Sequence, residues 1–173
     1  MNGPPLWTFP SAHVFVFRMR IASRRPFRVG RSKSGLGLFA TKPIKKGAFI
    51  IKYWGRKLPN KVADELETKY LFELNSRFTI DGSSRRNVAR YINHSCRPNA
   101  ETDVVKGEVI ITAYKNIPTG DEITYDYGKD YFNTFIKPHG CRCAKCTDPE
   151  VIAARRKKSK QKKAAKTKKA KRA

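Results

Sequence analysis

Acidic residues are scarce in this chain. Only 14 Asp and Glu stand against 38 Lys and Arg among 173 residues, so the formal net charge is +24. No apolar run reaches the length needed to cross a bilayer, which argues against a membrane-spanning helix. The apolar stretch 6–17 has no positive charge before it and no small-residue cleavage site after it, so we expect no conventional secretion signal. With only four cysteines, the sequence favours a reducing compartment over a disulfide framework.

Half of the net positive charge lies at the C-terminal end. Residues 151–173 contain twelve Lys or Arg and no acid, and the other residues have 26 bases against 14 acids. The segment 149–173 lacks apolar periodicity, so the sequence predicts a disordered basic tail. Such a tail suits non-specific, salt-sensitive contact with nucleic acid, although a solvated solubility tail stays open. No amphipathic face supports membrane binding.

Short extended runs dominate the middle of the chain. Apolar and β-branched residues bounded by turn signals predict strands at 26–29, 48–54, 70–74, 78–80 and 122–125, and a hairpin over 103–114. Short helices are expected after Pro59 and from Ser84 through Ile92. No strand–helix–strand rhythm is present, so the fold class is mainly β.

Two polar stretches carry the chemistry. Gly35-x-Gly37 on its own is typical of a turn; it lacks the third glycine of a dinucleotide-binding loop, but it offers backbone without Cβ against which a ligand can lie. The stretch 90–99 packs two side-chain amides, an imidazole and a thiol into ten residues, with Pro98 stiffening its exit.

Taken together, the ordered motifs of the chain resemble the SET domain, the protein-lysine methyltransferase fold. The matching segments are 34–40, 53–55, 80–82, 87–99, 120–127 and the closing Cys-x-Cys-x2-Cys. The resemblance implies a β-clip-like fold of several short curved sheets, few short helices and a C-terminal pseudoknot. We therefore expect an N-terminal extension (1–25), a SET domain (26–130), a post-SET zinc-binding segment (131–148) and the basic tail.

The resemblance also implies roles for individual residues. S-adenosylmethionine would be bound by Gly35, Leu36, Gly37, Tyr70, Arg90, Asn93 and His94. Tyr127 matches the catalytic tyrosine, and Tyr53 matches a residue that lines the lysine channel. Tyr125 stands where Phe or Tyr controls how many methyl groups fit, so mainly monomethylation is expected, with dimethylation next.

Four cysteines match the zinc site of the post-SET segment: Cys96, Cys141, Cys143 and Cys146. Four thiolates make a closed tetrahedral zinc site. Only two residues separate Cys143 from Cys146, where four is the common family spacing, so the chain departs from the family pattern at this point. His139 is nearby and stands as a substitute ligand or, as we expect, an exposed loop histidine.

Substrate and location are less specified. Arg56 replaces the usual glutamate after Tyr-x-Gly, which predicts a preference for less basic peptides. A lysine-containing, histone-like protein near nucleic acid is the expected substrate, in a nucleus or a bacterial nucleoid. A catalytically silent scaffold that binds nucleic acid is the alternative. The oligomeric state is not readable from the sequence.

Overall fold

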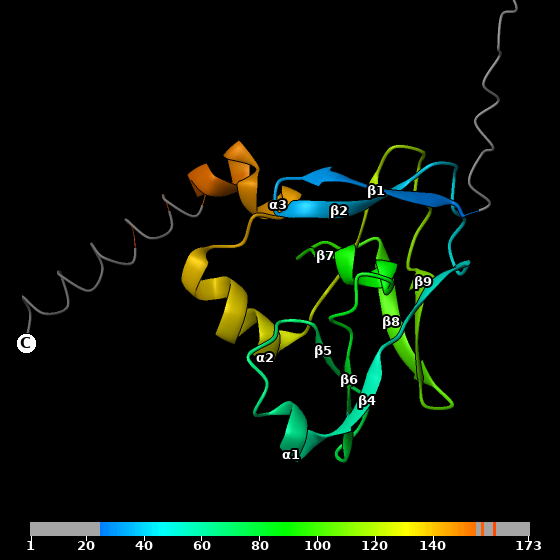
Figure 1. Ribbon diagram of the computed structural model, residues 1–173. Helices are drawn as coiled ribbons and strands as arrows, with labels where there is room; N and C mark the ends of the chain where they lie inside the picture. Colours follow the sequence, from blue (N-terminus) through cyan, green and yellow to red (C-terminus); the bar gives the residue numbers. More distant parts are fainter. Residues whose placement is uncertain (1–24, 155–156, 158–160, 162–173) are drawn as a thin grey trace, which may run out of the picture.

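The computed structural model describes residues 25–154, 157 and 161 (Figure 1). The N-terminal extension and most of the basic tail lie outside this range. The described part is built from three small sheets and a few short helices, which confirms the mainly β prediction. No helix among the described residues is both long enough and apolar enough to cross a membrane.

The first sheet joins segments that are far apart in the sequence. Its strand order is β1 (Phe27–Ser32), β2 (Gly35–Ala40), β10 (Glu122–Tyr125) and β7 (Asn93–His94). Gly35 and Gly37 therefore belong to a strand, and the turn lies before them at residues 33–34, so a turn at the glycines themselves is wrong. β7 runs parallel to β10, which places Asn93 beside Thr124 and His94 beside Tyr125.

The other two sheets complete the body. One has the order β3 (Phe49–Tyr53), β9 (Glu108–Ala113), β8 (Ala100–Val105), and the other has β4 (Arg56–Pro59), β6 (Phe78–Asp81), β5 (Leu71–Glu73). The predicted β8–β9 hairpin is present. Lys106 and Gly107 have φ values of 52° and 78°, which are the left-handed conformations that a tight two-residue hairpin turn requires.

The core sits between the sheets. Leu38, Val109, Ile111 and Ile123 are fully buried at its centre. Helix α1 (Asn60–Ala63) begins where Pro59 and Asn60 predicted. The helix expected up to Ile92 is shorter, a 3-10 turn η1 (Val88–Tyr91), and it delivers the chain directly into β7.

The chain after β10 is helical, which the sequence did not predict. α2 (Lys129–Tyr131), the π-helix η2 (Phe132–Ile136) and the 3-10 turn η3 (Lys137–His139) follow one another, and α3 (Ala144–Thr147) lies beside β1 and β2 (Figure 1). Residues 149–154 are also helical, because Pro149 starts the turn and the Asp148 carboxylate accepts from Glu150 N–H at 2.8 Å. This helical turn was not predicted from the sequence.

Candidate functional site

One cavity of about 850 Å³ gathers most of the predicted site residues. Eight of the ten residues assigned to cofactor or catalysis line it: Leu36, Tyr53, Tyr70, Arg90, Asn93, His94, Tyr125 and Tyr127. Gly35 and Gly37 do not line it. Residues from β2, β3, β7 and β10 thus meet here, because the parallel pairing of β7 with β10 closes the distance between them.

Three tyrosines form the inner wall. The Tyr127 hydroxyl donates to Ile92 O at 2.6 Å, and the Tyr53 hydroxyl donates to Tyr70 O at 2.7 Å. The rings of Tyr125 and Tyr127 are 4.9 Å apart. Burial raises the pKa of all three phenols above the ordinary value. At neutral pH these groups are therefore uncharged hydrogen-bonding hydroxyls and not bases.

The Asn93–His94 pair is held from several sides. Asn93 Nδ2 donates to Leu36 O at 3.0 Å and to Glu122 Oε1 at 2.7 Å. His94 Nδ1 accepts from Tyr127 N–H at 3.2 Å, and its Nε2 lies 3.3 Å from Cys96 Sγ. Burial lowers the pKa of His94, partly offset by the Asp126 carboxylate 3.6 Å away.

Arg90 packs against Tyr70 at the side of the cavity. Its guanidinium carbon lies 3.8 Å from the centre of the Tyr70 ring, which is cation–π geometry. Arg90 also donates from Nη1 to Ser83 O, while its buried Nε has no hydrogen-bond partner among the described residues. Arg90 therefore fixes Tyr70 in place as well as lining the cavity.

The helical segment 129–139 contributes two aromatic residues of the cavity that were not predicted as site residues. Tyr131 and Phe135 project from the helical segment 129–139, with ring centres 4.8 Å apart. The Tyr131 hydroxyl donates to Lys69 O at 3.1 Å, and its ring meets that of Tyr127 edge-on at 5.0 Å. The signal in the sequence is their separation of four residues, which places two side chains on one face of a helix. His139 is exposed and also lines the cavity.

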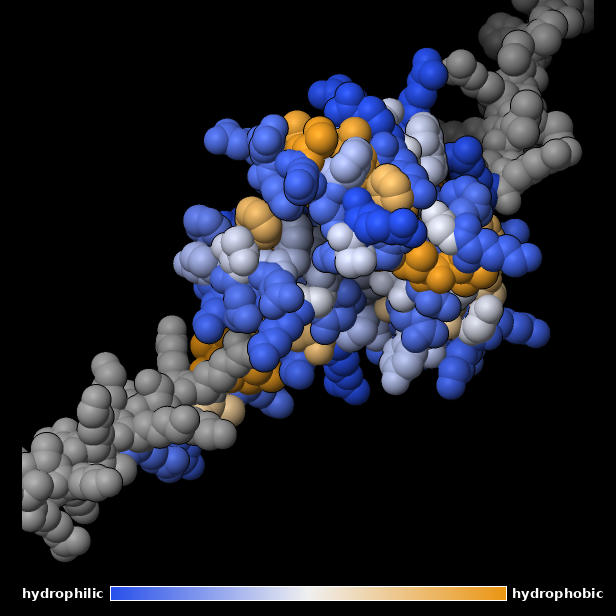
Figure 2. Space-filling view, turned by 90° about the horizontal axis from the view of Figure 1, so that it is seen from below, coloured by the Kyte–Doolittle hydropathy of each residue, from blue (hydrophilic) through white to orange (hydrophobic). Residues whose placement is uncertain are grey.

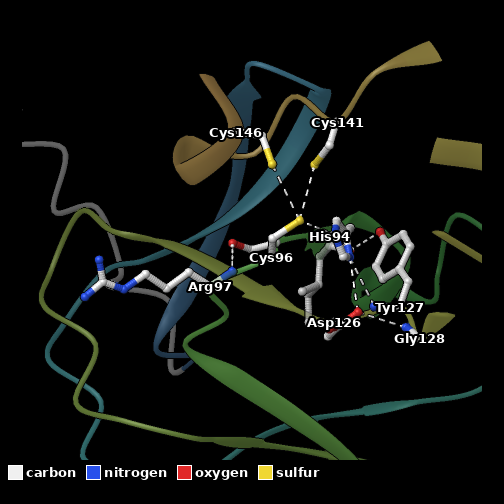
Figure 3. A network of polar contacts seen from close by, with 10 residues as sticks. His94, Cys96, Arg97, Asp126, Tyr127, Gly128, Cys141 and Cys146 are labelled. Atoms are coloured by element: carbon white, nitrogen blue, oxygen red, sulfur yellow. Dashed lines mark hydrogen bonds and ion pairs between the residues drawn. The ribbon is translucent and has the colours of Figure 1, made fainter. Parts of the chain in front are cut away.

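The four cysteines converge beside this cavity. Their Sγ atoms all lie within 4.8 Å of one another, with Cys96 3.8 Å from Cys141 and 3.6 Å from Cys146 (Figure 3). A tetrahedron with zinc–sulfur bonds of about 2.3 Å has sulfur–sulfur edges of about 3.8 Å, so the donor set fits such an ion. The short spacing is accommodated because α3 turns directly after Cys143, with Cys146 N–H donating to Cys143 O at 2.9 Å.

The thiols affect one another's ionisation. Burial raises the pKa of Cys96 well above its ordinary value and that of Cys141 to about 11. At Cys143 burial acts in the same direction, but hydrogen bonds from the backbone at Cys96 and Cys146 outweigh it and lower the pKa to about 7. Four thiolates this close need a cation to balance them, and a coordinated metal ion supplies that charge.

Arg56 lies away from the cavity. It pairs with Asp81 at 3.5 Å and is not part of the lining. The charge that it was expected to bring to the substrate approach is therefore partly balanced by a neighbouring acid. The face in Figure 2 is largely hydrophilic, in keeping with the basic composition of the body.

The fold and the cavity define a mainly β protein in which a tyrosine-lined cavity adjoins a four-cysteine cluster. The SET domain family matches residues 35–128 of the chain, so the chain belongs to the SET-domain family.

Three relatives illustrate the range of similar proteins. Histone-lysine N-methyltransferase 2D of Homo sapiens is 36% identical over 127 residues, covering 66% of this chain and 2% of its own length. Histone-lysine N-methyltransferase trr of Drosophila melanogaster is 34% identical over 143 residues (75% and 6%). Histone-lysine N-methyltransferase, H3 lysine-4 specific, of Schizosaccharomyces pombe is 33% identical over 130 residues (67% and 14%). The match thus covers only a small part of each of these relatives.

Proposed function

We propose that the protein is an S-adenosylmethionine-dependent protein-lysine N-methyltransferase. The observation that carries the proposal is the cavity that brings Leu36, Asn93 and His94 together with the tyrosines Tyr53, Tyr125 and Tyr127. The cofactor, when bound, supplies an electrophilic methyl group. The chain must then orient a lysine amine, keep it uncharged and exclude water.

The cavity is suited to an uncharged amine. A free lysine has a pKa of about 10.4, and transfer into an apolar, water-poor space lowers it because the charged form is disfavoured. Tyr53, Tyr125 and Tyr127 do not take the proton at neutral pH, since burial raises the pKa of each. The amine therefore loses its proton to solvent, on the way in or through the cavity mouth.

Tyr127 is the residue that would orient the amine. Its hydroxyl hydrogen is already donated to Ile92 O at 2.6 Å, so the oxygen is left as an acceptor for an amine N–H. Tyr125 is buried beside it. Its hydroxyl would limit the space around the amine, which supports mainly monomethylation.

We assign the cysteine cluster to a structural zinc ion held by Cys96, Cys141, Cys143 and Cys146. The ion would attach the segment after β10 to the loop after β7, and so keep Tyr131 and Phe135 over the cavity. A zinc ion with four thiolate ligands has no open position, so it would not contact the reacting groups and would act only through the structure around it.

The substrate we propose is a histone or another protein associated with nucleic acid. The similar proteins are named as histone-lysine methyltransferases. The basic segment 151–173 would hold the enzyme near a polyanion and raise its local concentration there. The competing possibility, a silent scaffold that binds nucleic acid, is less consistent with the tyrosine hydroxyls gathered in the cavity.

Transfer of labelled methyl groups tests this assignment. Purified protein is incubated with labelled S-adenosylmethionine and core histones. Tyr127→Phe is expected to reduce transfer by about 100-fold, the scale of lost alignment in an active site. Tyr114→Phe is the matched control, because Tyr114 is 53% exposed and lies outside the cavity. No transfer by the wild-type protein to histones or to a host lysate would favour the scaffold.

A further inference from the structure

A carboxylate next to the cavity connects three strands. Glu122, on β10, accepts from Ser32 Oγ of β1 at 2.8 Å through Oε2 and from Asn93 Nδ2 of β7 at 2.7 Å through Oε1. Asn93 Nδ2 donates its second hydrogen to Leu36 O of β2 at 3.0 Å. Glu122 itself does not line the cavity, whereas Asn93 and Leu36 do.

This arrangement determines which end of the Asn93 amide is available. Both Nδ2 hydrogens are committed to protein acceptors, so the amide oxygen is the group left for a ligand. Leu36 O and the Glu122 carboxylate are both acceptors, so both favour the orientation in which the NH₂ end of the amide faces them. The carboxylate is the charged one of the two, and its hydrogen bond is therefore the stronger.

The position of the Glu122 carboxylate also explains why residue 37 is a glycine. A Cβ at Gly37 would lie 2.4 Å from Glu122 Oε1 and 3.0 Å from Ser32 Cβ. The glutamate cannot swing aside without losing Ser32 and Asn93. Gly35 differs from Gly37, because a Cβ at Gly35 would meet nothing within 4 Å. Glycine is favoured at position 35 by its backbone conformation, which has a φ of +112°. The space at Gly37 is thus taken by protein and not kept open for a ligand.

We propose that Glu122 is a positioning residue of the cofactor site, which orients the Asn93 amide with its oxygen toward the cofactor and requires glycine at position 37. The inference rests on the proposed cofactor-dependent function and extends it to a residue that touches no substrate. Glu122 acts only through Asn93 and the β2 backbone, so it affects cofactor binding more than the methyl-transfer step.

Calorimetric titration of the whole chain with S-adenosylmethionine tests the first part. Glu122→Gln and Glu122→Ala are expected to weaken the cofactor Kd about ten-fold, the scale of a hydrogen bond to a charged group. The cofactor KM rises by the same factor, while kcat at saturating cofactor changes little. Glu101→Gln, at an exposed position of β8, is the control and leaves both unchanged. A fall in kcat with unchanged Kd would overturn the positioning role.

A double substitution tests the steric part. Gly37→Ala is expected to weaken cofactor binding and lower the melting temperature in the wild-type and Glu122→Gln backgrounds, because glutamine fills the same space. In the Glu122→Ala background the penalty of Gly37→Ala is smaller, because only the 3.0 Å contact with Ser32 Cβ remains. An equal penalty in all three backgrounds would show that the glycine serves another purpose. If the wild-type protein does not bind the cofactor, the proposed function and this inference are both wrong. If the wild-type protein binds it and the Glu122 variants bind it equally well, this inference alone is wrong.

Discussion

Removal of the proposed zinc ion should release the segment after β10 and leave the body folded. Between residues 129 and 147 only Cys143 and Cys146 are buried, and α2, η2 and η3 bury no residue at all. The buried core cluster, by contrast, is drawn entirely from residues between Phe27 and Tyr125. The two parts therefore depend on different sources of stability.

Magnitudes indicate how strongly the segment depends on the ion. Its polar ties to the body include Tyr131 to Lys69 at 3.1 Å and Lys33 to Thr147 at 3.3 Å, each worth about 1 kcal/mol. The Phe132–His94 ring pair, 5.3 Å apart, adds about 1 kcal/mol. Zinc held by a small structural site contributes about 10–16 kcal/mol. The ion is thus expected to dominate the attachment.

Hydrogen–deuterium exchange on freshly reduced protein, with and without a strong chelator, is the measurement. Amides in 129–147 should lose protection after chelation, while those of β3, β8 and β9 keep it. Cys96→Ser should reproduce the effect without chelator, because Cys96 is the ligand outside the segment. Metal analysis first confirms that the chelator has removed the ion. The reasoning is refuted if the amides of 129–147 then keep their protection, or if protection is lost throughout the body.

Two further outcomes are expected. Tyr125→Phe should shift the products from monomethyl-lysine toward di- and trimethyl-lysine on the same peptide, since the lost hydroxyl widens the space beside Tyr127. Mass spectrometry of the methylated peptide measures this shift, and an unchanged product ratio would contradict the prediction. Deletion of 151–173 removes twelve basic residues, so DNA retention at about 150 mM salt should be lost while methylation of a short peptide is unchanged; DNA retention by the truncated protein would place the contact on the body.

The strands could be predicted because their signals are local. Apolar runs bounded by glycine, proline and asparagine marked most of them, and Lys106-Gly107 marked the turn of the β8–β9 hairpin. The meeting of Cys96 with the three C-terminal cysteines was predicted from the resemblance to the SET family. The strand at Gly35–Ala40 was missed because two glycines weaken every local strand signal. Its partners, β1 and β10, override that preference through pairing.

The missed parts of the site depend on long-range packing. Nothing local to Glu122 indicates that its carboxylate meets Ser32 and Asn93, which are 90 and 29 residues away. The segment 129–139 lacks capping side chains and contains Pro138, so its helical turns had no start signal. Tyr131 lines the cavity and donates to Lys69 O, which is 62 residues away in the sequence.

The His94 ring makes the cysteine cluster and the tyrosine wall one unit. Its Nδ1 accepts from Tyr127 N–H, and burial lowers its pKa, so the neutral ring carries its hydrogen on Nε2. That hydrogen points to Cys96 Sγ, 3.3 Å away (Figure 3). A metal-bound thiolate is a stronger acceptor than a free thiol, so loading the cluster also fixes the ring that holds the Tyr127 backbone. Loss of the ion therefore reaches Tyr127 twice, through the detached aromatic cover and through His94, and kcat should fall even where the body remains folded.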